Sequence, residues 1–182
     1  PTGLAAGSTQ ASTAPARTVA TKRTVTQAGS GDMFLVVQPS PVLGFGAGAN
    51  KPWLQELPDP VNKIAWQTVA ELHPSTAKRL GVDNGDFVEI TTAAGKLTLP
   101  VWIYLGVRPD VVAVYAGRGH KGDGREYYDA RKLHLTGYGR YADGVGENAM
   151  VLVPVGEDAQ SGGMALQTMK AAVRATGDKV RL

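Results

Sequence analysis

The chain has 182 residues, a hydrophobic fraction of 43%, a formal charge of +3 and no cysteine. This length suits one domain with tails, and the missing thiols exclude disulfides, cysteine nucleophiles and thiolate ligation of zinc or iron–sulfur clusters within these residues. No stripe of Lys and Arg is interleaved with aromatic residues, so nucleic acid is not an expected partner, and no apolar run reaches the ~20 residues of a membrane span.

Residues 1–32 predict an extended arm. They are rich in Ala, Thr, Ser and Gly and contain no aromatic residue, so they cannot form a core of their own. Because the chain begins with Pro1 rather than Met, we expect a processed product or a piece of a longer polypeptide.

The compact domain is expected to begin at Met33. Residues 33–38 form an apolar run that predicts a buried strand, and the glycine-rich residues 40–50 predict a loop. Three prolines within residues 52–60 argue against a helix there. Residues 64–66 and 69–72 are expected to be extended.

The next segment predicts a short helix followed by a hairpin. Pro74 suits the first turn of a helix, and Gly81 can adopt the left-handed conformation that ends one. Residues 87–92 and 96–104 alternate as two strands around a turn at Gly95.

The last part of the domain predicts two more core strands, at residues 111–115 and 150–154, separated by a long polar, glycine-rich segment. Residues 155–182 are predicted to be a polar exit, in which residues 164–175 form either a weak helix or an extended segment. Many short strands, few helices and many turns together predict a mainly β fold closed into a barrel.

Several short strings carry a family resemblance between residues 33 and 154. They are Glu71-Leu72-His73-Pro74, Leu80-Gly81-Val82, Gly85-Asp86, Val88-Glu89-Ile90, Gly95-Lys96-Leu97, Gly117-Arg118-Gly119-His120 and Gly146-Glu147-Asn148. This pattern resembles the dinucleotide-binding domain of molybdopterin oxidoreductases of the dimethyl-sulfoxide-reductase superfamily. The resemblance implies a six-stranded double-psi β-barrel over residues 33–154, with one or two short helices and extended tails at residues 1–32 and 155–182.

A narrower resemblance rests on residues 49–60, which read ANKPWLQELPDP, and on residues 117–120 and 139–142. These strings are similar to the large iron–sulfur subunit of alternative complex III. The similarity implies a non-catalytic scaffold segment in a menaquinol-oxidising respiratory complex that passes electrons to a cytochrome or terminal oxidase. It also implies that this chain has lost the pterin and binds no cofactor.

The same resemblance implies the surroundings of the chain. Iron–sulfur clusters and haem are expected in neighbouring segments or subunits, and residues 155–182 would lead toward a ferredoxin-like region. The expected partners are the iron–sulfur, cytochrome c and quinol-binding subunits of a membrane complex. The chain itself would be a peripheral part on the periplasmic side.

The alternative is a genuine molybdopterin guanine dinucleotide-binding domain. It would use Arg118, Gly119, His120 and Asn148, because glycine lets the backbone approach a phosphate, arginine can pair with it, and a carboxamide can both donate to and accept from a purine or pterin edge. In the favoured interpretation these residues form an ordinary barrel turn, with Arg118 on an internal carboxylate and Asn148 capping the last strand.

Two surfaces are candidate interfaces. Trp53 and Leu54 either dock against a neighbouring domain or cover the end of their own barrel. A second surface has an interface-like composition and comprises Tyr127, Tyr128, Arg131 and Tyr138.

The three histidines do not have the spacing of metal ligands. A third interpretation of the chain is a free-standing barrel that acts as an adaptor module.

Overall fold

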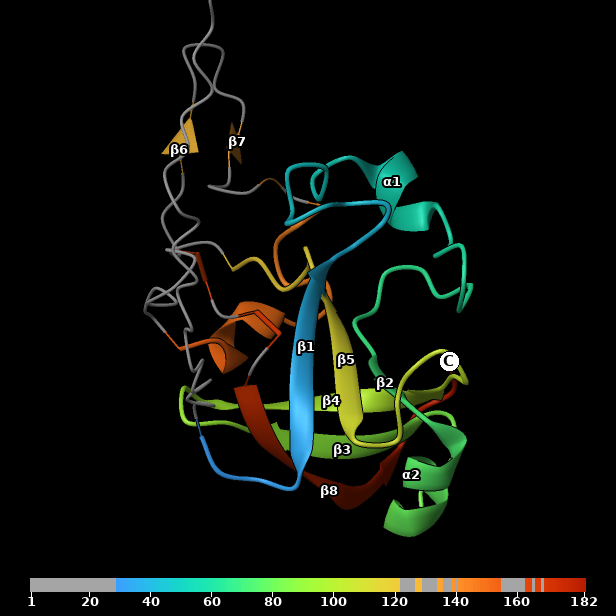
Figure 1. The fold of residues 1–182 in the computed structure, drawn as a ribbon. Helices are drawn as coiled ribbons and strands as arrows, with labels where there is room; N and C mark the ends of the chain where they lie inside the picture. The colour runs from blue at the N-terminus through green and yellow to red at the C-terminus, as the bar shows by residue number, and fades with distance from the viewer. Residues whose placement is uncertain are drawn as a thin grey trace, which may run out of the picture.

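The computed structural model describes residues 29–121, 127–128, 134–135, 139, 141–154, 163–164, 166–167 and 169–182. Six strands close a barrel in the order β1-β5-β2-β4-β3-β8 (Figure 1). Their bounds are β1 Met33–Pro39, β2 Ala70–Leu72, β3 Asp86–Thr91, β4 Lys96–Ile103, β5 Val111–Ala116 and β8 Met169–Lys179. The strands β6 (Tyr127–Tyr128) and β7 (His134–Leu135) pair as a separate sheet. The predicted mainly β class is confirmed.

The pairing of β1 with β5 fixes which end of the barrel carries the glycine-rich turns. The two strands are parallel, from Phe34 opposite Val111 to Pro39 opposite Ala116. Parallel strands end at the same edge of a sheet. The chain therefore leaves both strands at one rim of the barrel, and the loops that follow them are neighbours.

The core follows the period-two pattern of the strands. In β1 the side chains of Met33, Leu35 and Val37 are fully buried, while their neighbours along the strand are more exposed. Strands β3 and β5 contribute further buried aliphatic residues. A Val- and Leu-rich interior of this kind is stabilised by roughly 25 cal/mol for each Å² of apolar surface removed from water.

The helix α1 (Pro52–Glu56) corrects the expectation that residues 52–60 are too rich in proline for a helix. Pro52 occupies the first helical position, where a missing N–H costs nothing. The helix then stops before Leu57, which is extended and precedes Pro58, as the steric restriction on a residue before proline requires. The prolines limit this helix to little more than one turn but do not prevent it.

The helix α2 (Pro74–Leu80) confirms the prediction made from its ends. The Nδ1 atom of His73 accepts a hydrogen bond from the backbone N–H of Ser75 at 3.1 Å. Gly81 has a φ of +69° and caps the last turn. Glycine is favoured at this position because it has no Cβ to clash in the left-handed conformation.

The last core strand is not where the sequence predicted it. Residues 149–152 form the short 3₁₀ helix η1, in which Ala149 and Leu152 are buried. A short apolar run does not distinguish a strand from a buried helical turn. Here the side chain of Asn148 caps the first turn and favours the helical conformation. The sixth strand is β8, which pairs with both β1 and β3. The barrel therefore extends past the predicted boundary at Pro154.

Candidate functional site

Three glycine-rich segments meet where β1 and β5 end, and we call them together the glycine rim: residues 40–50, 117–120 and 141–148. Ser40 and Gly44 form a bridge, with the Gly44 N–H donating to the Ser40 carbonyl at 2.8 Å. A Cβ on Gly117 would lie 2.7 Å from the Gly44 carbonyl oxygen, and one on Gly46 would lie 2.3 Å from Nε2 of His120. These contacts require backbone without side chains, so the first two segments pack directly on each other.

The second and third segments are joined in the same way. The Gly119 N–H donates to the Val145 carbonyl at 2.8 Å, and the Gly144 N–H donates to the His120 carbonyl at 2.8 Å. A Cβ on Gly119, which has a φ of +75°, would lie 2.0 Å from the backbone nitrogen of Asn148. The structure thus brings together the four residues Arg118, Gly119, His120 and Asn148 at one rim, although they come from two distant parts of the sequence.

Arg118 is half-buried, and two of its guanidinium nitrogens donate to other parts of the protein. Its Nε donates to Oε1 of Gln55 at 3.0 Å, and its Nη1 donates to the Gln67 carbonyl at 2.9 Å. Burial lowers the pKa of Arg118, an effect partly offset by the nearby carboxylate of Asp59; the guanidinium still carries its charge at neutral pH. The partners are a carboxamide and a backbone carbonyl, not the internal carboxylate that the sequence suggested.

Asn148 has its side-chain oxygen committed to the backbone. Its Oδ1 accepts from the Met150 N–H at 3.0 Å and starts η1, so the residue does cap an element, although that element is a helical turn and not a strand. The residue is exposed, and its amide nitrogen forms no hydrogen bond with the described part of the chain. The cap therefore fixes the side chain while leaving a donor at the rim.

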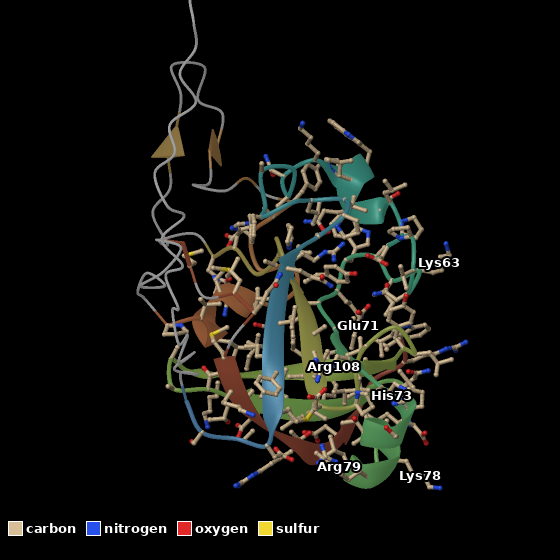
Figure 2. All side chains as sticks on the ribbon, in the orientation of Figure 1. Lys63, Glu71, His73, Lys78, Arg79 and Arg108 are labelled. Carbon is tan, nitrogen blue, oxygen red and sulfur yellow. The ribbon has the colours of Figure 1, made fainter. Side chains whose placement is uncertain are left out.

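A buried polar cluster lies beneath the rim. Glu71 lies on β2 (Figure 2). It is only 1% exposed, and its Oε1 accepts from Nδ2 of Asn62 at 3.2 Å. Burial raises the pKa of Glu71, the hydrogen bond from Asn62 lowers it, and the charge of Asp59 raises it. Burial, together with the charges of Glu71 and Asp59, raises the pKa of Tyr115 to about 12, so its phenol keeps its proton.

Residues that the sequence did not single out hold the rim in place. Gln55 is fully buried, and its Nε2 donates to the Ala49 carbonyl at 2.9 Å. Oγ1 of Thr68 donates to the Glu147 carbonyl at 3.0 Å and accepts from the Glu147 N–H at 3.1 Å. A Gln within a proline-flanked string and a lone Thr carry no recognisable pattern, so only the folded chain reveals these contacts.

The candidate interface residues fall into two groups. Trp53 on α1 is 67% exposed, so it does not cover its own barrel, whereas Leu54 is half-buried and lies against Gly48. Tyr127 and Tyr128 form β6, whose side chains are outside the described residues, as are Arg131 and Tyr138 entirely. Docking at either surface stays a prediction.

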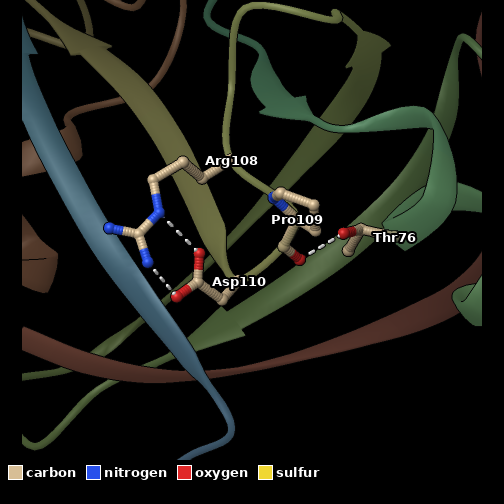
Figure 3. Close-up of polar contacts among 4 residues, drawn as sticks. All are labelled: Thr76, Arg108, Pro109 and Asp110. Carbon is tan, nitrogen blue, oxygen red and sulfur yellow. Dashed lines mark hydrogen bonds and ion pairs between the residues drawn. The ribbon is translucent and has the colours of Figure 1, made fainter.

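The opposite end of the barrel has a polar arrangement that supports the fold. Arg108 forms a two-point ion pair with Asp110, with Nη2 lying 2.6 Å from Oδ2, and Oγ1 of Thr76 donates to the Pro109 carbonyl (Figure 3). The bond from Thr76 joins α2 to the turn before β5, and the ion pair lies within that turn. Among the described residues no group of three His, Cys, Asp or Glu side chains is placed to bind a metal ion, and no described helix is long and apolar enough to cross a membrane.

Two of the three rim segments lie within a part of the chain that matches a known protein family. Residues 53–169 match the family described as Molydopterin dinucleotide binding domain. The chain is 36% identical over 105 residues to the arsenate respiratory reductase molybdopterin-containing subunit ArrA of Shewanella sp. (strain ANA-3), which covers 57% of the chain and 12% of that protein. The corresponding subunit of Chrysiogenes arsenatis is 36% identical over 84 residues, covering 44% of the chain and 10% of that protein.

Two further similarities are more distant. The thiosulfate reductase molybdopterin-containing subunit PhsA of Salmonella typhimurium is 28% identical over 74 residues, which covers 41% of the chain and 10% of that protein. Acetylene hydratase from Pelobacter acetylenicus superposes with a TM-score of 0.53 and 18% identity, covering 79% of the chain and 18% of that structure; this likeness shows the fold alone. The chain spans about a tenth of the length of the curated relatives it matches.

These similarities overturn two expectations drawn from the sequence. The relatives are molybdopterin-containing reductase subunits, so the assignment to a non-catalytic scaffold of a menaquinol-oxidising, alternative-complex-III-like assembly is wrong. The expectation that this chain binds no cofactor is wrong as well, because the matched family is defined by dinucleotide binding. In the structure, side chains of residues 49–60 contact the glycine rim, and the string does not separate this chain from the molybdopterin-containing relatives.

The matched segment contains β2 to β5, both later rim segments and η1, and it covers well over half of the chain. This chain belongs to the Molydopterin dinucleotide binding domain family.

Proposed function

We propose that the glycine rim binds a molybdopterin dinucleotide, in its guanine form, as the cofactor-binding domain of a molybdenum oxidoreductase. The observation that carries the proposal is the direct packing of Gly119 on Asn148, within the segment that matches the family. It sets donors from two turns side by side at one edge of a rigid barrel. Binding sites on rigid elements hold their donors more accurately than sites on isolated loops.

The donor chemistry of the rim suits this cofactor. After the internal hydrogen bonds are counted, Nη2 of Arg118 and Nδ2 of Asn148 remain without a partner among the described residues. A cationic donor suits a phosphate and a carboxamide donor suits a carbonyl or ring nitrogen of a purine or pterin. When bound, the cofactor supplies the redox chemistry; the residues of this chain bind and orient it.

The substrate belongs to the whole protein rather than to this barrel. Three relatives are named as reductases of arsenate or thiosulfate, which favours reduction of an inorganic oxyanion of arsenic or sulfur. Membrane association and the periplasmic side rest on the sequence resemblance alone and stay predictions.

Two glycine substitutions with the same backbone strain test the site. Gly119→Ala puts a Cβ 2.0 Å from the Asn148 nitrogen at a φ of +75°, whereas Gly81→Ala at the far end of the barrel has a φ of +69° and nothing within 4 Å. Both cost roughly 1–2 kcal/mol of left-handed backbone strain. Only Gly119→Ala separates the two turns, so we expect molybdenum and guanine nucleotide per polypeptide to fall several-fold in that variant of the natural protein.

The control variant Gly81→Ala should keep the wild-type cofactor content and lose only the thermal stability that the backbone strain costs, whereas Gly119→Ala should lose more, because its Cβ overlaps the backbone of Asn148. Equal cofactor content in both variants, measured by metal analysis and by chromatography of the released nucleotide, would remove the glycine rim from the binding site.

A further inference from the structure

We infer that the segment Asn50–Asp59 positions the cofactor-binding turns of the glycine rim through the side chains of Asn50 and Gln55. We call this segment the clamp. This inference rests on the proposed function and adds positioning residues to it. The string includes α1, and its side chains at Asn50 and Gln55 form hydrogen bonds with other parts of this chain. Its function follows from where those side chains point.

Gln55 connects α1 to the second rim segment. The side chain is fully buried and uses both ends, donating from Nε2 to the Ala49 carbonyl at 2.9 Å and accepting at Oε1 from Nε of Arg118 at 3.0 Å. A carboxamide is a neutral side chain that can do both at once. Gln55 therefore fixes the plane of the guanidinium and, with it, the direction in which Nη2 points.

Asn50 connects the same string to the third rim segment. Its Oδ1 accepts from the Tyr141 N–H at 3.1 Å. Gly139, with a φ of +87°, lies so close that a Cβ there would be 1.9 Å from Cγ of Asn50. The carboxamide thus sits flat against the backbone that leads into residues 141–148, the segment that ends in Asn148.

The two sides of the string differ. Gln55 and Asp59 are buried, whereas Trp53 is largely exposed. The Oδ1 atom of Asp59 accepts from the N–H groups of Val61 and Asn62 at 2.8 and 3.0 Å, which closes the string into its own turn. A one-turn helix between prolines is stiff, so it holds its polar side chains at fixed positions against the rim.

Substitutions at Gln55 separate positioning from stability. Gln55→Met removes both hydrogen bonds at similar volume; Gln55→Glu loses the bond to Ala49 but keeps an acceptor for Arg118. Gln67→Met is the matched control, because Gln67 is exposed and contacts Arg118 only through its backbone carbonyl. In the natural protein we expect Q55M to retain about tenfold less cofactor after gel filtration, as loss of a hydrogen bond to a charged group implies.

Both Gln55 variants should lose thermal stability. Under the same conditions, however, Q55E should retain most of the cofactor, and Q67M should match wild type. Retention in Q55M equal to that of wild type, or an equal loss in Q55M and Q55E, would overturn the positioning role of Gln55. A wild-type protein without molybdenum or guanine nucleotide would overturn the proposed function and this inference together.

Asn50 provides a second test that does not depend on a buried side chain. Asn50 is exposed, so Asn50→Ala leaves the core intact and removes only the acceptor for Tyr141, while Asn50→Asp keeps it. We expect a several-fold loss of cofactor retention in N50A and near wild-type retention in N50D. Full retention in N50A would limit the clamp to Gln55, and full retention in both N50A and Q55M would refute it.

Discussion

Glu71 is a buried acidic residue that lowers the free energy of unfolding of the barrel at neutral pH. Its carboxyl is almost fully buried, and the one hydrogen bond that it receives from the described residues comes from Asn62, which brings no opposite charge. Burial raises its pKa above the ordinary value of 4.5. The folded protein therefore binds more protons than the unfolded chain between the two pKa values, so the free energy of unfolding falls as pH rises through that interval and stays lower above it.

Glu71→Gln should therefore stabilise the protein at neutral pH. The new side chain still offers an oxygen to Asn62 but carries no charge. The expected gain is about 1.4 kcal/mol for each pH unit that separates the folded and unfolded pKa values, and it should disappear below pH 4.5. Urea unfolding at several pH values measures it, with the exposed Glu56→Gln as the control. A gain that persists unchanged in acid would show that charge burial is not its cause.

The residues of the site differ in how far the sequence could predict them. Arg118, Gly119, His120 and Asn148 were all named from their motifs, and they do lie together. The favoured interpretation places Arg118 on an internal carboxylate, but its partner in the structure is the carboxamide of Gln55. This partner was not predictable, because Gln55 is far away in the sequence and has no pattern of its own. Local motifs identify donors; long-range contacts decide where the donors point.

At the scale of elements, the predictions that succeeded had physical markers at both ends. The helix α2 has Pro74 at its start and Gly81 at its end, and the β3–β4 hairpin has a glycine-containing turn between two strands that pair in register from Phe87 opposite Pro100 to Thr91 opposite Lys96. The helix α1 was missed although Pro52 marks its start, because the later prolines argue against a helix. The strand predicted at residues 150–154 was wrong and the segment that forms β8 was left open, and both lack such markers. Residues 150–153 are uniformly apolar, and β8 carries charged and small residues along its exposed second half, so its partners rather than its composition make it a strand.

The strand β8 closes the barrel, and its removal should prevent folding. It pairs with β1 through Met33 opposite Ala171 and with β3 through Ile90 opposite Val173. A chain that stops at Pro154 would leave both partner strands with an open edge. We expect residues 1–182 to show a cooperative thermal transition by circular dichroism and residues 1–154 to show none. An equally cooperative transition in the shorter chain would make β8 an accessory strand.

At the scale of the whole molecule, the barrel separates two tasks. One end carries the glycine rim, with its donors and the buried cluster beneath it. The opposite end carries α2, which a hydrogen bond from Thr76 joins to the Pro109 turn, and a surface ion pair of Arg108 with Asp110. The matched segments make up only 10–12% of the relatives' length, so we expect the barrel to contribute one wall of a larger cofactor site.

The most direct test is a density map of the natural protein loaded with its cofactor. We expect a molybdopterin dinucleotide against the glycine rim, with a polar group of the cofactor within hydrogen-bonding distance of the Asn148 amide nitrogen. A map that shows the cofactor bound elsewhere, with the rim in contact only with protein or solvent, would refute the proposed function.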